Sequence, residues 1–273
     1  MKTANLTSVA IAALLGIVML AGAGCTNSKT NQETSDNMET LNLTQEWDKK
    51  FPQSDKVNHR KVTFKNRYGI TLAADLYEPK NVEGKLAAIA VSGPFGAVKE
   101  QASGLYAQTM AERGFLTLAF DPSYTGESGG EPRNVASPDI NTEDFSAAVD
   151  FLTALPNVDA ERIGIIGICG FGGMGLNAAA MDTRIKATVA STMYDMSRVN
   201  ANGYFDAEDS ADDRNKKREM MNVIRTRDAQ SGTITPGVHG LPDSITGEEP
   251  QFVKDYFDYY KTNRGFHVRS INS

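Results

Sequence analysis

The chain of 273 residues has little cysteine and little histidine, with two cysteines and three histidines in all. These few residues form no cluster with the spacing of a structural zinc site. Basic residues are outnumbered by acidic ones, which leaves a formal net charge of −6. A nucleic-acid binder would need a basic face for phosphate contacts. We therefore expect no metal, no cofactor and no nucleic-acid partner. There is also no tandem repeat.

The sequence also has no long apolar segment, because the run at residues 9–20 is too short for a comfortable transmembrane helix. This run follows Lys2, and small residues lead from it to Cys25, as in an export signal. Residues 1–25 resemble a bacterial lipoprotein signal, in which Cys25 becomes the acylated N-terminus. The match is imperfect, because Gly22 stands where lipoprotein signals usually carry leucine. An ordinary secretory signal that is cleaved nearby is therefore the alternative. In both cases we expect export. Lipidation would anchor the protein at a membrane surface of the bacterial cell envelope.

The segment between the signal and the fold, residues 26–56, is predicted to be a flexible tether followed by a short helix. Its first part is polar and has almost nothing to bury. Residues 41–56 have an amphipathic pattern around Trp47 and Phe51, which favours a short helix.

Residues 57–196 alternate strand-like apolar runs with helical patterns. The expected strands are residues 61–64, 70–77, 86–91, 115–120, 162–168 and 185–190, and helices are expected at 100–113 and from about residue 141. This order predicts an α/β core with a mostly parallel, doubly wound sheet. In such sheets the functional site lies beyond the carboxyl ends of the strands.

The stretch around Cys169 has the pattern of a nucleophile elbow, with a strand, a tight glycine turn and a helix. Gly167 would let the backbone bend sharply, and the sulfur would project above the sheet. The N-terminus of the following helix would favour the thiolate. The alternative is that Cys169 is a small buried hydrophobe. Its position after the end of the strand favours the nucleophile, although Phe171 replaces the last glycine of the usual pattern.

Four stretches in this order resemble the α/β-hydrolase superfamily, and within it bacterial dienelactone-hydrolase and Xaa-Pro-dipeptidyl-peptidase-like hydrolases. They are residues 92–101 (SGPFGAVKEQ), 121–128 (DPSYTGES), 167–173 (GICGFGG) and 192–196 (TMYDM). The resemblance implies hydrolysis of a small-molecule ester, thioester or lactone through an acyl-enzyme on Cys169. It also implies that the Gly170 N–H stabilises the oxyanion. The second donor should come from residues 92–96, where Pro94 has no N–H. Phe95 is therefore preferred, with Gly96 as the alternative.

The resemblance further implies an acid and then a histidine after the nucleophile, on two more strand–helix units. Asp195 is a candidate acid. No base is identified, because we expect His239 to face solvent, His267 to serve packing or the surface, and His59 to precede the sheet. The expectation is that the chain lacks the C-terminal part of the family's domain, which would leave an unpaired sheet edge. Its activity in this form would be weak or absent.

Residues 197–273 are predicted to be a cap inserted after the sixth strand. The charged stretch 206–228 favours an exposed helix, and a tyrosine-rich stripe near the end favours a second helix. We expect this stripe to pack a cap helix onto the core rather than to contact substrate. It consists of Phe252, Tyr256, Tyr259 and Tyr260.

Two other hypotheses compete with hydrolysis. One is a non-catalytic lipoprotein that keeps a hydrolase scaffold, which the missing histidine favours. The other is a redox function of Cys169, which is the weakest because the mature chain offers no resolving cysteine. The sequence does not predict the oligomeric state.

Overall fold

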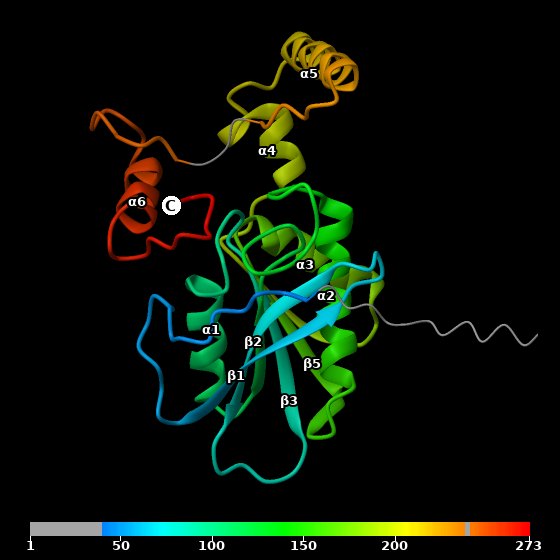
Figure 1. Cartoon of the computed structure of the whole chain (residues 1–273), viewed down its shortest axis with the longest axis vertical. Coiled ribbons are helices and arrows are strands. Elements are labelled where there is room, and N and C mark those ends of the chain that lie inside the picture. The colour runs from blue at the N-terminus through cyan, green and yellow to red at the C-terminus, as the bar shows by residue number, and fades with distance from the viewer. Residues whose placement is uncertain (1–39, 238–240) are drawn as a thin grey trace, which may run out of the picture. The chain divides into compact units, whose positions relative to one another are not determined.

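The computed structural model describes residues 40–237 and 241–273 (Figure 1). The expected signal segment, the lipidated Cys25, the tether up to residue 39, and His239 lie outside these residues. Among the helices of the described part, none is long and apolar enough to cross a membrane.

The core is a six-stranded sheet with the strand order β1-β2-β4-β3-β5-β6. The pairings β1–β2 and β2–β4 are antiparallel, and β4–β3, β3–β5 and β5–β6 are parallel. The predicted mostly parallel α/β sheet is therefore confirmed. Its strands are β1 (Val57–Lys65), β2 (Thr71–Pro79), β3 (Leu86–Ser92), β4 (Leu116–Phe120), β5 (Val158–Ile168) and β6 (Ile185–Ser191).

Helices cover both faces of this sheet, as Figure 1 shows. Helix α1 (Ala102–Ala111) packs on one face through Ala107 and Ala111. Helices α2 (Pro138–Thr153) and α3 (Gly170–Met181) lie on the other face, where Phe145 and Phe171 are buried. Two apolar cores result, one on each side of the sheet. This is the doubly wound arrangement predicted from the alternation of strands and helices.

The degree to which each strand is buried depends on its position in the sheet. Every residue of the central strand β4 is buried, which explains its uninterrupted apolar sequence. Strand β6 is at the other extreme, since it pairs with β5 and, among the described residues, with no other strand. Its Val189 side chain is 52% exposed. The sheet therefore ends in an open edge at β6 within the described part of the chain.

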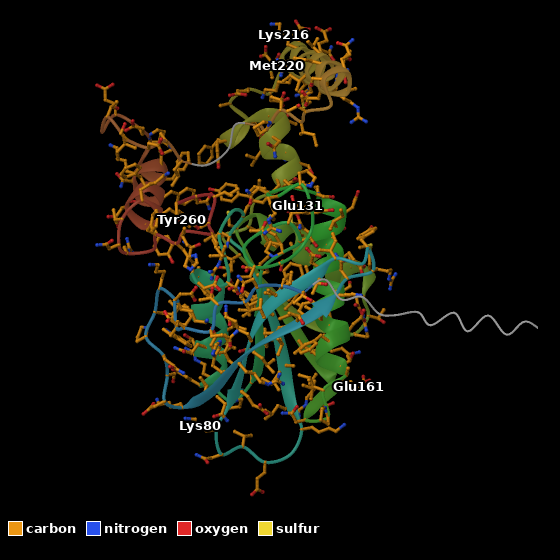
Figure 2. All side chains as sticks on the ribbon, viewed as in Figure 1. Lys80, Glu131, Glu161, Lys216, Met220 and Tyr260 are labelled. Carbon is orange, nitrogen blue, oxygen red and sulfur yellow. The ribbon has the colours of Figure 1, made fainter. Side chains whose placement is uncertain are left out.

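Four helical segments follow β6: α4 (Met196–Asn202), the 3₁₀-helix η1 (Tyr204–Asp206), α5 (Ala211–Ser231) and α6 (Gln251–Tyr260). Helix α5 is highly charged and has no buried residue. Helix α6 is amphipathic, and Tyr260 at its end is buried (Figure 2). The predicted helices after the sixth strand are thus present.

Two predictions about the N-terminal part are wrong. Residues 41–56 form no helix; they run as an irregular segment against the fold. Contacts with the core replace helical hydrogen bonds, since Lys50 N donates to Glu100 O at 2.8 Å and Lys49 Nζ lies 3.1 Å from Asp75. His59 does not precede the sheet but lies within β1.

Candidate active site

Cys169 lies at the turn between the end of β5 and the start of α3. Its backbone angles, φ 58° and ψ −126°, are rare for a residue with a side chain and cost about 1–3 kcal/mol. Hydrogen bonds hold the turn: Cys169 N donates to Ser191 O and Gly172 N donates to Cys169 O, both at 2.9 Å. The strain is thus imposed by the neighbouring strand and helix, at the one cysteine of the described residues.

Gly167 of the elbow and Gly93 of the loop after β3 allow backbone segments to approach each other closely. A Cβ on Gly167 would lie 2.2 Å from the Phe171 carbonyl oxygen. A Cβ on Gly93 would lie 2.4 Å from the Ile168 carbonyl oxygen. Gly167 is not among the glycines with positive φ. As expected from the sequence, the missing Cβ of Gly167 lets the backbone turn without a clash against α3, and no positive φ is needed.

Two backbone N–H groups point at the Cys169 sulfur, those of Gly170 and Phe95. They are the two residues that the sequence names as oxyanion donors. The pKa of the thiol is nevertheless raised, because burial outweighs these two hydrogen bonds. The N–H of Gly170 at the helix N-terminus thus favours the thiolate, as expected, but burial has the larger effect on the pKa. The half-buried sulfur is a thiol at neutral pH.

The loop that carries Phe95 is held by a C-terminal segment that the sequence did not indicate. The carbonyl of Gly96 accepts from Ile271 N at 3.0 Å and from Ser270 Oγ at 2.9 Å. Asn272 Nδ2 donates to the Phe95 carbonyl at 2.8 Å. Residues 270–272 therefore hold the two peptide groups that directly follow the Phe95 N–H, the group that faces the sulfur.

The candidate acid is engaged elsewhere. Asp195 is exposed and caps α4, where its side chain accepts from Arg198 N at 3.0 Å. Its position beyond β6 agrees with the sequence, but its recorded partner is a backbone amide and not an imidazole.

The two described histidines have partners away from the elbow. His59 Nε2 is bonded to Asp75 at 2.7 Å. His267 is buried, lies 3.5 Å from Asp48, and has its pKa lowered by burial. For residues 40–237 and 241–273, the hydrogen bonds of the structure join neither ring to Cys169. His267 thus serves packing, one of the two roles expected for it.

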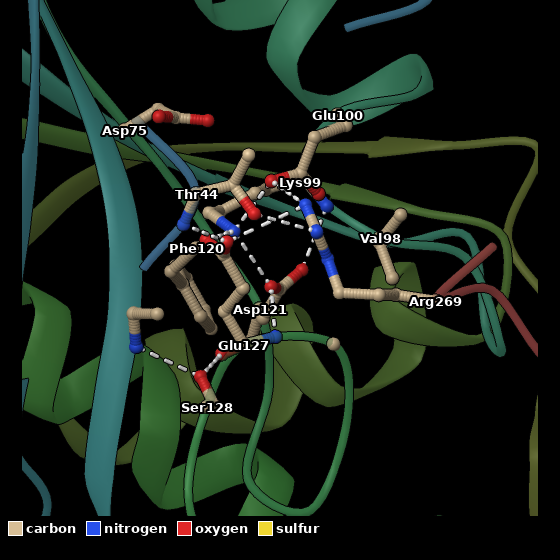
Figure 3. A network of polar contacts seen from close by, with 12 residues as sticks. Thr44, Asp75, Val98, Lys99, Glu100, Phe120, Asp121, Glu127, Ser128 and Arg269 are labelled. Carbon is tan, nitrogen blue, oxygen red and sulfur yellow. Dashed lines mark hydrogen bonds and ion pairs between the residues drawn. The ribbon is translucent and has the colours of Figure 1, made fainter. Parts of the chain in front are cut away.

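A buried cluster of charges lies next to the loop of Phe95 (Figure 3). The Lys99 side chain is fully buried, and its ammonium lies 2.6 Å from Glu100, 2.9 Å from Asp121 and 2.7 Å from Glu127. Burial alone would lower the pKa of Lys99, but the surrounding carboxylates raise it well above its usual range. Lys99 is therefore a permanent cation.

The same cluster joins the two ends of the described chain. Arg269 lies 2.6 Å from Asp48 and 3.0 Å from Glu100, and Lys61 of β1 pairs with Glu127. The three carboxylates around Lys99 have the composition of a cation site, but the ammonium lies among them, so the cluster is an ion-pair network. Lys99, Asp121 and Glu127 fall within the stretches that carry the family resemblance, but the sequence assigned them no role.

A cavity of about 280 Å³ opens beside Cys169. Four tyrosines line it together with Phe95: Tyr194, Tyr204, Tyr256 and Tyr260. Two of these belong to the stripe on α6 that was expected to pack against the core. Tyr260 does so, being 6% exposed, and yet both Tyr256 and Tyr260 face the cavity. The expected packing against the core is thus found for Tyr260, and two of the four stripe residues also line the cavity.

This strand order, with helices on both faces and the elbow after β5, defines an α/β-hydrolase fold. The family model of the X-Pro dipeptidyl-peptidase (S15) family matches residues 68–235. Because the match covers more than half of the chain, the protein belongs to this family of hydrolases.

Individual relatives agree with this assignment. The uncharacterized protein PA2218 of Pseudomonas aeruginosa is 61% identical over 265 residues, which are 96% of this chain and 71% of that protein. Its crystal structure aligns with a TM-score of 0.82 at 65% identity, over 86% of this chain and 73% of that one. The uncharacterized protein YcjY of Escherichia coli is 40% identical over 76% of this chain and 68% of its own length. A thiohydrolase of Eupenicillium brefeldianum is 32% identical over 51% of this chain and 44% of its own length.

Proposed function

We propose that the protein hydrolyses an ester-type bond of a small molecule, with a thioester as the preferred substrate, through an acyl-enzyme on Cys169. The observation that carries the proposal is the convergence of the Gly170 and Phe95 N–H groups on the sulfur. A carbonyl carbon bonded to that sulfur would hold its oxygen within reach of both donors. The relatives named thiohydrolases, which are similar over about half of the chain, support the thioester.

The proposed reaction has two steps. In the first, the Cys169 sulfur bonds to the acyl carbon, the bond to the leaving thiol or alcohol breaks, and the leaving group takes up the proton. In the second, water attacks the acyl-enzyme, releases the acid and restores the thiol. A thiol with a raised pKa must lose its proton before or during attack. Among the described residues no hydrogen bond joins His59 or His267 to Cys169, so the proposal assigns the proton to neither of these imidazoles.

The test is the mass of the intact protein after exposure to an acyl thioester. We expect one acyl group on the wild type and none on Cys169→Ala. Cys169→Ser keeps a hydroxyl at the elbow and should acylate more slowly. An equal adduct on wild type and Cys169→Ala, or no adduct on the wild type, would contradict the nucleophile assignment.

A second candidate is acyl binding without turnover on a hydrolase scaffold. The raised pKa of the thiol and the engagement of both described histidines favour it. It predicts saturable binding of acyl compounds with no acid released. Hydrolysis with a rate that follows the titration of an imidazole would exclude it.

We further propose export and lipid anchoring through Cys25, with the membrane as partner. The support is the sequence of residues 1–25: a basic start, an apolar run and small residues before the cysteine. We expect the protein from its native host to partition into detergent and to begin at a lipid-modified Cys25. Cys25→Ser should leave the detergent phase, and a mature protein that keeps residues 1–24 would refute the proposal.

A further inference from the structure

The cavity beside Cys169 has an unusually aromatic wall built from three separate segments. Tyr194 follows β6, Tyr204 lies in η1, and Tyr256 and Tyr260 come from α6. Phe95 of the oxyanion loop lines it as well. A core that only needed apolar filling would not require hydroxyl-bearing rings from three elements. The composition therefore calls for a functional explanation.

Two of the three ring contacts along this wall are edge to face, and the third, between Tyr204 and Phe252, is tilted. The ring centroids of Tyr194 and Tyr204 are 5.7 Å apart, and the ring planes make an angle of 88°. The ring of Phe252 lies between two tyrosines, with its centroid 5.0 Å from that of Tyr204 and 6.0 Å from that of Tyr256. Such geometry pairs the positive edge of one ring with the negative face of the next. A flat ring that enters the cavity can continue the same series of contacts, whereas a puckered aliphatic ring presents no such edge or face.

The polar ends of the tyrosines are largely satisfied within the wall. The hydroxyl of Tyr256 is hydrogen-bonded to Tyr194, and that of Tyr260 is hydrogen-bonded to Asn272. The hydroxyls of Tyr204, Tyr256 and Tyr260 are all near enough to Cys169 to interact with it electrostatically. Cys169 itself lines the cavity, so a group that fills it lies within reach of the sulfur.

The volume of the cavity limits the size of the group that can bind in it. An apolar cavity of about 150 Å³ holds one benzene ring in an engineered protein that serves as a reference case. The cavity here measures about 280 Å³. It therefore has room for one ring with a short chain to the carbonyl carbon.

We propose that this cavity is the acyl-binding site and that it selects acyl groups with a single aromatic ring, as in esters or thioesters of benzoic or phenylpropenoic acids. The proposal rests on the proposed function, because it assigns the acyl half of the bond that Cys169 attacks. The preference for a flat ring over an aliphatic ring of equal size should amount to roughly 2- to 10-fold in affinity, the usual worth of edge-to-face ring contacts.

The experiment measures binding apart from chemistry, in the Cys169→Ala protein. The probes are cinnamamide and 3-cyclohexylpropanamide, which have the same number of non-hydrogen atoms and differ in the flatness of the ring and its linker. We expect cinnamamide to bind roughly 2- to 10-fold more tightly. Adding Tyr256→Leu should abolish the preference, whereas adding Tyr256→Phe should keep most of it because the ring remains.

A matched control lies on the same helix. Tyr259 belongs to α6 but does not line the cavity, so adding Tyr259→Leu should leave the preference intact. Its result separates loss of a cavity ring from general damage to α6. Equal affinities for the two amides, or a preference that survives Tyr256→Leu, would overturn the proposal.

Acylation of Cys169 is measured separately with the wild type. If the amide preference is found but no acyl-enzyme forms, the acyl-binding site stands and the proposed hydrolysis fails. If the acyl-enzyme forms but the two amides bind equally, hydrolysis stands and the aromatic selection fails.

Discussion

Replacing Lys99 with methionine should cause a large loss of stability. Methionine keeps an unbranched stem of similar length but removes the ammonium that lies within 2.6–2.9 Å of three carboxylates. These carboxylates lie within 4.8 Å of one another. Breaking a buried ion pair from one side costs about 3–5 kcal/mol, because the opposite charge stays buried without its partner. We expect a loss in that range, up to about half of the stability of an ordinary domain.

The loss should depend on pH in a defined direction. In the wild type, burial raises the pKa of Glu127, but Lys99 and Lys61 outweigh it, so the pKa is lowered. A carboxyl with a depressed folded pKa adds stability above its unfolded pKa of about 4.3, and loses it as the pH falls further. Lys99→Met lacks much of that contribution. The difference between wild type and variant should therefore be largest near neutral pH and shrink below about pH 4.5.

The assay is urea unfolding followed by the fluorescence of the single tryptophan, Trp47, which packs against Phe51 and His59. With a urea slope of about 2–3 kcal/mol/M, the midpoint should fall by about 1–2 M. Lys216→Met is the matched control, since Lys216 is 74% exposed and makes one long ion pair with Asp213, so its midpoint should hardly move. A Lys99→Met midpoint equal to that of the control would refute the role of the buried ammonium.

Three further outcomes follow from the site. Asn272→Ala removes the hydrogen bond to the Phe95 carbonyl and should slow acylation roughly 2- to 10-fold; an unchanged acylation rate would contradict the positioning role. Gly96→Ala, at φ 76° and with its new Cβ 2.6 Å from the Asn272 Oδ1 atom, should lower the free energy of unfolding by about 1–3 kcal/mol, measured by the same urea unfolding. Alkylation of Cys169 by iodoacetamide should keep accelerating above pH 9, because burial raises the thiol pKa; a plateau near neutral pH would show a thiolate instead.

The sheet and the elbow could be predicted because their determinants are local. Uninterrupted apolar runs mark the buried parallel strands, and glycines beside Cys169 mark the turn. The prediction of a helix at residues 41–56 failed for a physical reason. Trp47 and Phe51 are spaced like one helical face, but Trp47 Nε1 donates to the Phe51 carbonyl at 2.9 Å in a non-helical segment. The core supplied better partners than a short helix could offer.

The ion-pair network could not be predicted, because its members are far apart in the chain. Lys99 and Glu127 are 28 positions apart, and Arg269 and Asp48 are 221 positions apart. From the sequence alone, a charged residue is expected to be exposed, because charged side chains are rarely fully buried. The clamp on the Phe95 loop was missed for the same reason, since Asn272 is 177 positions from its partner. Hydrophobic periodicity predicts contacts between residues that are close in the sequence, whereas these contacts join residues that are far apart in it.

The loop at Phe95 connects the two halves of the site. The N–H of Phe95 faces the sulfur, and its carbonyl accepts from Asn272. Four positions later, Lys99 anchors the same loop in the ion-pair network through its side chain and through its N–H, which donates to Asp121 at 2.7 Å. An oxyanion donor is effective only if it is fixed before the charge develops. In the proposed reaction the buried charges would give this donor its rigidity, although none of Lys99, Asp121 and Glu127 lines the cavity beside Cys169.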